Sequence, residues 1–290
     1  MKFSSGTDSV AGNSEGFKLY TGAASVNVVA VNPTAEELSN IYGRTVEKVA
    51  DYVGTDKNGK SYSRIDVIVQ VAKVDNKKVD EKIFGKISFF LREDIRKNND
   101  ESKVQVINEY GKTAWATTSV LEAKGKPQRN DGSDMEDYIL PYRPAFIGEE
   151  ELINFLIAFL GIPSTKDFKT NTIKTGDALK ECMASIPLED IKQLLKGNIK
   201  SLKEVFNIKP NNEVYVMFAV QSNDENKKYQ HVLSSVFAKA KDSGYKTRFI
   251  EWINKNPNRL GNLIYSVDFK EYKETPSEIP ATKSSDNPWE

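Results

Sequence analysis

The stretch YSRIDVIVQVAKV, residues 62–74, decides the fold class, because its apolar and polar side chains alternate with a period of two. That period is typical of a β-strand, in which successive side chains point to opposite faces of a sheet. Turn residues bound the stretch on both sides, as DKNG at 56–59 and DNKK at 75–78. One face is wholly apolar and is expected to join the core: Ile65, Val67, Val69 and Val71.

Similar strand patterns occur on both sides of this stretch, with helical patterns between them. Further strands are predicted at 25–31, 83–93, 212–221, 227–240 and 262–272. Helices are predicted at 34–43, 148–163, 185–198, 201–206 and 245–256. Thr34 precedes the first helix and Gly43 follows it, which are the residue types that begin and end helices.

These elements predict a β-rich α+β protein built on a small, partly open antiparallel barrel. The strands within 17–140 and 211–273 are expected to form one domain around a helical insertion at 141–210, with two separate domains as the alternative. Residues 1–16 and 274–290 are polar and poor in apolar side chains, so both tails are predicted to be disordered.

The composition excludes several classes of chemistry. Lysine plus arginine and aspartate plus glutamate balance at 41 each in 290 residues, which argues against a uniformly basic protein. Cys182 is the single cysteine and His231 the single histidine, so a disulfide framework and a zinc site made of cysteines or histidines are excluded. We expect no metal, cofactor or catalytic residue. Without a signal segment or a membrane-length apolar run, the sequence predicts a soluble intracellular protein.

The GKT at residues 111–113 matches only the end of a phosphate-binding loop. Such a loop needs a glycine five residues before the first residue of that tripeptide, and this position holds Val106. Nucleotide hydrolysis is therefore not expected. The segment INEYGKTAWA, residues 107–116, is better interpreted as an aromatic and basic binding segment.

The faces of the strands that point away from the core mix aromatic rings with lysine and arginine. A solvated sheet face carries few rings, whereas single-stranded nucleic acid is held by rings that stack on bases and cations that follow the phosphates. The alternative is that these rings pack beneath the helices. The residues predicted to bind nucleic acid are Tyr62, Arg64, Phe84, Lys86, Phe90, Arg92, Tyr110, Lys112, Trp115, Lys227, Lys228, Tyr229, His231, Phe237 and Lys239.

A basic and aromatic band spans residues 226–260. Eight lysines and arginines stand against two acids there, in a chain whose total charge is zero. The same band contains five rings: Tyr229, Phe237, Tyr245, Phe249 and Trp252. This combination is the pattern expected of a nucleic-acid surface.

Several segments resemble the single-stranded-DNA-binding proteins of large tailed bacteriophages, in particular crAss-like phages. The similar segments are KLYTGAASVNVVAVNPTAEEL (18–38), KISFFLRE (86–93), INEYGKTAWA (107–116), RPAFIGEEELINFLIAFL (143–160) and, more loosely, KKYQHVLSSVFAKA (227–240). The resemblance implies an OB-like partly open antiparallel barrel. It also implies a non-enzymatic role in phage DNA replication, in the cytoplasm of the infected bacterial host cell, with single-stranded DNA as the ligand.

The chain ends in an acidic segment, ETPSEIPATKSSDNPWE at 274–290, with four carboxylate side chains against one lysine. It is similar to the acidic tails of many single-strand-binding proteins, which dock replication partners. By that similarity Asp286, Trp289 and Glu290 are predicted to contact a helicase, primase or polymerase. The alternative function is a structural, virion-associated interaction protein that binds no nucleic acid, in which the exposed rings form subunit contacts.

Overall fold

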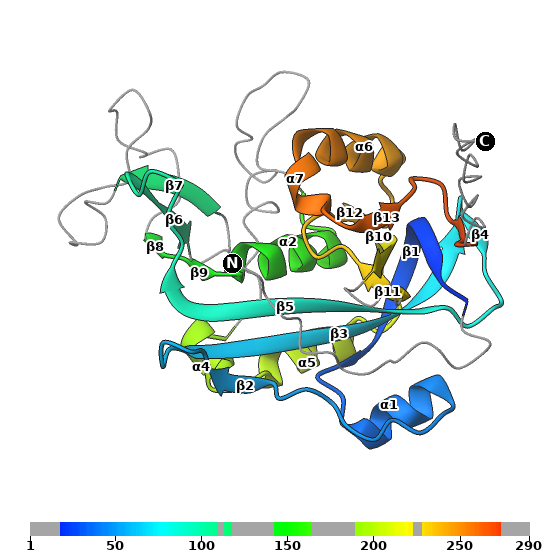
Figure 1. Ribbon diagram of the computed structural model, residues 1–290, viewed down its shortest axis with the longest axis horizontal. Helices are drawn as coiled ribbons and strands as arrows, with labels where there is room; N and C mark the ends of the chain where they lie inside the picture. The colour runs from blue at the N-terminus through cyan, green and yellow to red at the C-terminus, as the bar shows by residue number, and fades with distance from the viewer. Residues whose placement is uncertain (1–17, 109–112, 118–141, 164–188, 223–227, 274–290) are drawn as a thin grey trace, which may run out of the picture.

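A computed structural model describes residues 18–108, 113–117, 142–163, 189–222 and 228–273 (Figure 1). Within these ranges the main feature is a β-sheet with the strand order β11-β10-β1-β3-β5-β9. All the pairs along this path are antiparallel. Its strands are β1 (Tyr20–Val31), β3 (Ser61–Val74), β5 (Phe84–Ile95), β9 (Phe146–Ile147), β10 (Glu213–Ser222) and β11 (Lys228–Val232). The sheet therefore joins strands from both sides of the helical segment.

Short strands extend the sheet at its margins. Two of them pair with β3, two with β10 and one with β1. They are β2 (Val53–Thr55), β4 (Lys77–Lys78), β12 (Ala238–Lys239), β13 (Leu263–Tyr265) and β14 (Lys270–Glu271). A separate three-stranded sheet has the order β7-β6-β8 and consists of β6 (Lys103–Asn108), β7 (Thr113–Thr117) and β8 (Tyr142–Pro144).

The helices are α1 (Ala35–Tyr42), α2 (Glu149–Leu160), α4 (Ile191–Leu195), α5 (Lys200–Ile208), α6 (Tyr245–Lys255) and α7 (Pro257–Leu260). Helix α1 begins and ends where the sequence predicts. Thr34 and Glu37 bond reciprocally as a capping box, and Gly43 closes the helix in the left-handed conformation. In the described part of the chain, no helix has the length and apolar character needed to cross a membrane.

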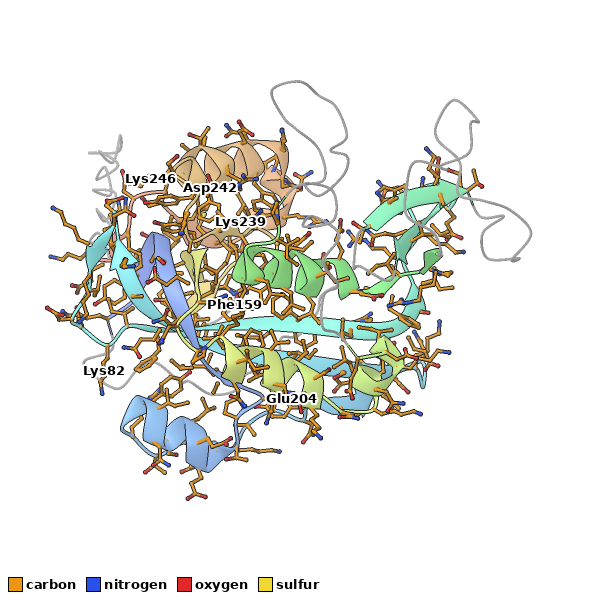
Figure 2. The ribbon with its side chains drawn as sticks, turned by 180° about the vertical axis from the view of Figure 1, so that it is seen from behind. Lys82, Phe159, Glu204, Lys239, Asp242 and Lys246 are labelled. Carbon is orange, nitrogen blue, oxygen red and sulfur yellow. The ribbon has the colours of Figure 1, made fainter. Side chains whose placement is uncertain are left out.

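The main core lies between the sheet and helices α2, α4 and α5. In Figure 1 strands β3 and β5 run across the front with α5 behind them, and Figure 2 shows α2 and α5 nearer the viewer from the opposite side. Aromatic rings cluster here: Phe155 of α2 lies 5.1 Å between centroids from Phe237, which precedes β12, and Phe159 of α2 lies 4.9 Å from Phe206 of α5. A second, smaller core lies on the other face of the sheet, where α6 packs on β10.

Three predicted elements are shorter than the sequence indicates. The predicted strand at 227–240 divides into β11 and β12, because Leu233 and Phe237 between them are buried in different cores. The predicted strand at 262–272 divides into β13 and β14, which pair with different strands. Within the described part of the predicted helix at 185–198, only α4 is helical, and Gly197 follows it with a φ of 83°.

The sheet is curled but is not a closed barrel. Strands β5 and β11, which lie toward opposite ends of the strand order, come together at Gly85 and Val232, although no strand pairing joins them in the described residues. A Cβ atom placed on Gly85 would lie 2.6 Å from Val232 Cγ2 and 2.8 Å from the ring of Phe218. The glycine therefore allows an approach of the two strands that no other residue permits.

We predict that Gly85→Ala lowers the free energy of unfolding by about 1–3 kcal/mol, because the added methyl group overpacks this contact. Urea unfolding followed by circular dichroism measures the change. Gly244→Ala is the matched control, since the nearest atom to its new Cβ lies at 3.4 Å, and it should cost less. A Gly85→Ala protein as stable as the wild type would show that the two strands do not press together here.

Candidate nucleic-acid interface

The pairing of β3 with β5 places six of the predicted contact residues on one surface. Residues directly opposite each other in an antiparallel pair share a face of the sheet. The opposed pairs are Tyr62 with Arg92, Arg64 with Phe90, Ile68 with Lys86 and Gln70 with Phe84. The intervening residues, among them Ile65, Val67 and Phe89, point into the main core. We call the first set, with Asp66 and Ser88, the outer face of β3 and β5.

Helices α2, α4 and α5 pack on the opposite side of these two strands and contribute nothing to the outer face (Figures 1 and 2). Helix α6 covers the equivalent face only over β10 and the neighbouring part of β1. Helix α1 borders the outer face at one end, where Tyr42 meets the edge of Phe84 at 5.4 Å between ring centroids. Among the described residues of the outer face, Phe90 is exposed, whereas Arg64, Asp66 and Ile68 are buried.

Phe90 and Arg64 form the centre of this surface. The side chain of Phe90 is 44% exposed, which is unusual for a phenylalanine. Arg64, opposite it on β3, is only 5% exposed, and its guanidinium carbon lies 5.5 Å from the centroid of the Phe90 ring. This geometry is a cation–π contact. Arg64 is thus not a solvent-facing phosphate contact, which corrects the role that the strand pattern predicts for it.

A buried carboxylate holds Arg64 in this position. Asp66 is 2% exposed, and its Oδ1 accepts hydrogen bonds from Arg64 Nε at 2.8 Å and from Ser88 Oγ at 2.7 Å. Lys86 Nζ lies 3.8 Å from the other carboxylate oxygen. A buried charge needs such partners, because desolvation is otherwise costly. Sequence analysis missed Asp66, although its place between Arg64 and Ile68 on a mixed face was a usable signal.

Cations and apolar side chains surround the centre. Lys86, Arg92, Tyr62 and Phe84 are all half-buried. The Tyr62 ring packs over Gly54, where an added Cβ would lie 2.7 Å from its hydroxyl oxygen. On the other side of Arg92, β9 contributes Ile147, which is exposed and was not anticipated because β9 is too short to show a pattern.

The hairpin of β6 and β7 presents a second exposed ring. Trp115 is 40% exposed and lies opposite the buried Gln105. The hairpin is fixed to the main sheet by Gln105, whose backbone N–H donates to Arg96 at 2.9 Å and whose carbonyl accepts from Ala145 at 2.8 Å. Tyr110 and Lys112 lie outside the described residues, so their predicted roles stay predictions.

The β11 region supports the sequence interpretation only in part. Lys228, Tyr229 and His231 are half-buried, and Lys228 Nζ donates to Ser222 Oγ at 2.7 Å. Phe237 is buried in the main core, 5.1 Å from Phe155, so it is not on a ligand-binding face as predicted. The amino group of Lys239 donates to the carbonyl of Ile162 after α2. Lys227 lies outside the described residues.

Only part of the basic and aromatic band at 226–260 presents its rings to solvent, since Tyr229 and Trp252 are half-buried and the other three rings are buried. Its rings Tyr245 and Phe249 are buried against β10 and belong to the second core. Lys246 pairs with Asp75 and Asp268, each at 2.8 Å, and the hydrogen bonds to these two carboxylates raise its pKa. Burial and a hydrogen bond to Asp75 raise the pKa of Tyr245 to about 12. Asp75 and Asp268, which lie outside the band in the sequence, therefore offset part of its positive charge.

The sequence also predicts partner contacts in the C-terminal tail and no metal site. Asp286, Trp289 and Glu290 lie outside the described residues, so their predicted contact with a partner stays a prediction. In the described ranges, no group of three or more His, Cys, Asp and Glu is arranged to hold a metal ion.

Comparison with models of known protein families, with curated proteins and with solved structures finds no match.

We predict that His231 titrates below its ordinary pKa of 6.5, because burial disfavours the protonated ring. At pH 7 the imidazole is then neutral and contributes no charge to a phosphate contact. Since the unfolded chain takes up this proton first, stability should fall as the pH drops below 6.5. A proton NMR titration of the single histidine measures the pKa directly. A value above 6.5 would contradict the assignment and make His231 a cation of the surface.

Proposed function

We propose that the chain binds single-stranded DNA without sequence preference on the outer face of β3 and β5. The observation that carries the proposal is the half-exposed Phe90 ring, which is backed by the guanidinium of Arg64. A base stacks on this ring, and phosphates on either side contact Lys86 and Arg92. The chain acts by binding alone, and no catalytic step is assigned to it.

The exposed ring favours a single strand over a duplex. Bases in a duplex are already stacked on each other, whereas an unpaired base can lie on an aromatic side chain. Every base has such a stacking face, so the contact tolerates any sequence, and each stacked base contributes about 1–3 kcal/mol. Along β5, Arg92 lies two positions beyond Phe90 and Lys86 lies four positions before it, so one cation stands on each side of the ring.

The strand order supports an OB-like barrel as the framework of this proposal. Strands β1, β3, β5, β10 and β11 follow one another in the chain, and the segment between β5 and β10 contains helices α2, α4 and α5 together with the short strands β6 to β9. Strands β5 and β11, which lie toward opposite ends of the strand order, approach each other at Gly85. OB-folds bind oligonucleotides on the face of their second and third strands, and these are β3 and β5 here.

Trp115 gives the proposal a second stacking position. It is exposed on a hairpin that is hydrogen-bonded to Arg96, the residue that follows β5, and we propose that a strand bound at Phe90 continues towards it. Arg96 anchors the hairpin region to α2 by ion pairs with Glu150 at 2.7 Å and Glu151 at 3.4 Å. We propose that Tyr110 and Lys112, which lie between β6 and β7 in the sequence, extend this contact.

A role in phage DNA replication, with partners docked on the acidic tail at 274–290, follows from the sequence resemblance alone. Just before this segment in the sequence, the N–H of Tyr272 donates to the Leu19 carbonyl at 2.7 Å. A tryptophan flanked by carboxylates suits a partner that offers an apolar pocket with a basic rim. We therefore propose the tail as a docking segment for a helicase, primase or polymerase.

A protein interaction surface is the second candidate. Ile147 is exposed opposite Arg92, so it and Phe90 offer exposed apolar side chains that a subunit contact would bury. Such a surface would mark a structural, virion-associated protein. Binding of nucleic acid distinguishes the two functions.

We predict tight binding to oligo-dT and weak binding to a duplex of equal length. The logarithm of the affinity should fall linearly with the logarithm of the salt concentration, since phosphate contacts release counterions. Titration of tryptophan fluorescence at several salt concentrations measures both quantities. Equal affinity for the duplex, or no binding to either at low salt, would refute the proposal and favour the protein interaction surface.

We predict that Phe90→Ala weakens oligo-dT binding by about 1–3 kcal/mol, because a stacked base loses its platform. The fold should persist, since nearly half of the side chain is exposed. Ile250→Ala is the matched control, because Ile250 is equally exposed and lies on α6, whose rings Tyr245 and Phe249 are buried. Loss of binding in Ile250→Ala with none in Phe90→Ala would move the site to α6.

A further inference from the structure

A buried carboxylate lies beneath the surface that we propose to bind a polyanion. Asp66 is 2% exposed and shares the outer face with Arg64, Lys86 and Phe90. A negative charge at this point repels phosphates, so through-space electrostatics alone makes it unfavourable for DNA binding. Its contacts indicate a different role.

The main chain around Asp66 is fixed from the neighbouring strand β1. Asn32, just after β1, has a φ of 44°, which asparagine tolerates better than most residues. Its side-chain oxygen accepts from the Asp66 N–H at 2.7 Å, its N–H donates to the Asp66 carbonyl at 2.8 Å, and its Nδ2 donates to the Arg64 carbonyl at 3.2 Å. Asp66 and Arg64 are therefore held in one arrangement before any ligand arrives.

The side-chain contacts of Asp66 fix the orientation of the guanidinium. Arg64 donates through Nε to Asp66 Oδ1, and the same oxygen accepts from Ser88 on β5. This leaves the guanidinium against the Phe90 ring, with its charge offset by the carboxylate. A guanidinium with 5% exposure has little access to a phosphate at the surface.

We infer, on the basis of the proposed function, that Asp66 is a positioning residue that commits Arg64 to support the Phe90 ring instead of contacting phosphate. The site thus has two parts, one that stacks on a base and one that contacts phosphates. Phe90, Arg64 and Asp66 form a charge-balanced platform for a base, and Lys86 and Arg92 form the rim that contacts the phosphates on either side.

For Asp66→Asn, this positioning role and simple electrostatics predict opposite changes in the affinity for oligo-dT. Removal of a negative charge from a DNA-binding face should tighten binding if charge alone matters. If Asp66 positions Arg64, the substitution should weaken oligo-dT binding by about 2- to 30-fold, the range that a cation–π contact supports. The loss should persist at high salt, where stacking supplies most of the affinity.

Two sets of variants separate these effects. Glu93→Gln removes an exposed acid next to Arg92 and is expected to leave binding unchanged or tighter. Arg64→Met should weaken binding without reducing the salt slope, whereas Arg92→Ala should reduce the slope. Asp66→Asn made in the Arg64→Met background should add no further loss, because Asp66 acts through Arg64. Additive losses would overturn the inference.

A measurement without DNA tests the same contact. In the free protein, the Phe90 ring current should displace the NMR resonance of the Arg64 Nε–H, and both Phe90→Ala and Asp66→Asn should remove the displacement. An unchanged resonance in Asp66→Asn would contradict the positioning role. If Asp66→Asn fails to fold, Ser88→Ala removes one of the two hydrogen bonds to the carboxylate and should shift the resonance and the affinity in the same directions.

The outcomes for the inference and for the proposed function are distinct. Failure of the wild type to bind oligo-dT overturns the proposed function. Binding by the wild type together with equal or tighter binding by Asp66→Asn overturns only the inference. Weaker binding by Asp66→Asn, with unchanged or tighter binding by Glu93→Gln, supports both.

Discussion

The register of the antiparallel ladder between β3 and β5 determines both the core and the proposed site. With Tyr62 opposite Arg92 and Gln70 opposite Phe84, one set of side chains enters the main core and the other set forms the outer face. A slip of one residue would exchange the two sets and place Arg64 and Lys86 in the core. The burial of Ile65, Val67 and Phe89 thus fixes the surface on the opposite side.

The surface combines one exposed aromatic ring with a buried ion pair between an arginine and an aspartate. Phe90 is open to solvent, while Arg64 and Asp66 beneath it are almost fully buried and paired with each other. A base can stack there without displacing a strongly hydrated ion. Lys86 and Arg92 remain half-buried at the margins, so the same few residues supply stacking and phosphate contact in separate places.

Sequence patterns predicted those features that depend on neighbouring residues. The alternation at 62–74 and 83–93 gave the two strands and both their faces, and Thr34 and Gly43 marked the ends of α1. Features that depend on distant residues were missed. Phe237 is buried against Phe155 of α2, and Phe249, which lies on α6, is buried against β10. Lys246 is paired with Asp75 and Asp268, which lie outside the band in the sequence. Counting the charges and rings in the sequence of 226–260 reveals neither the burial of these rings nor the ion pairs of Lys246.

Ultraviolet crosslinking of the protein to oligo-dT, followed by mass spectrometry of the peptides, tests the central claim most directly. The outer face of β3 and β5 is expected to contain the principal crosslinked residues, with Phe90 first among them and Trp115 as a second site. Crosslinks confined to α6 and α7, residues 245–260, with none on β3 or β5, would contradict this account.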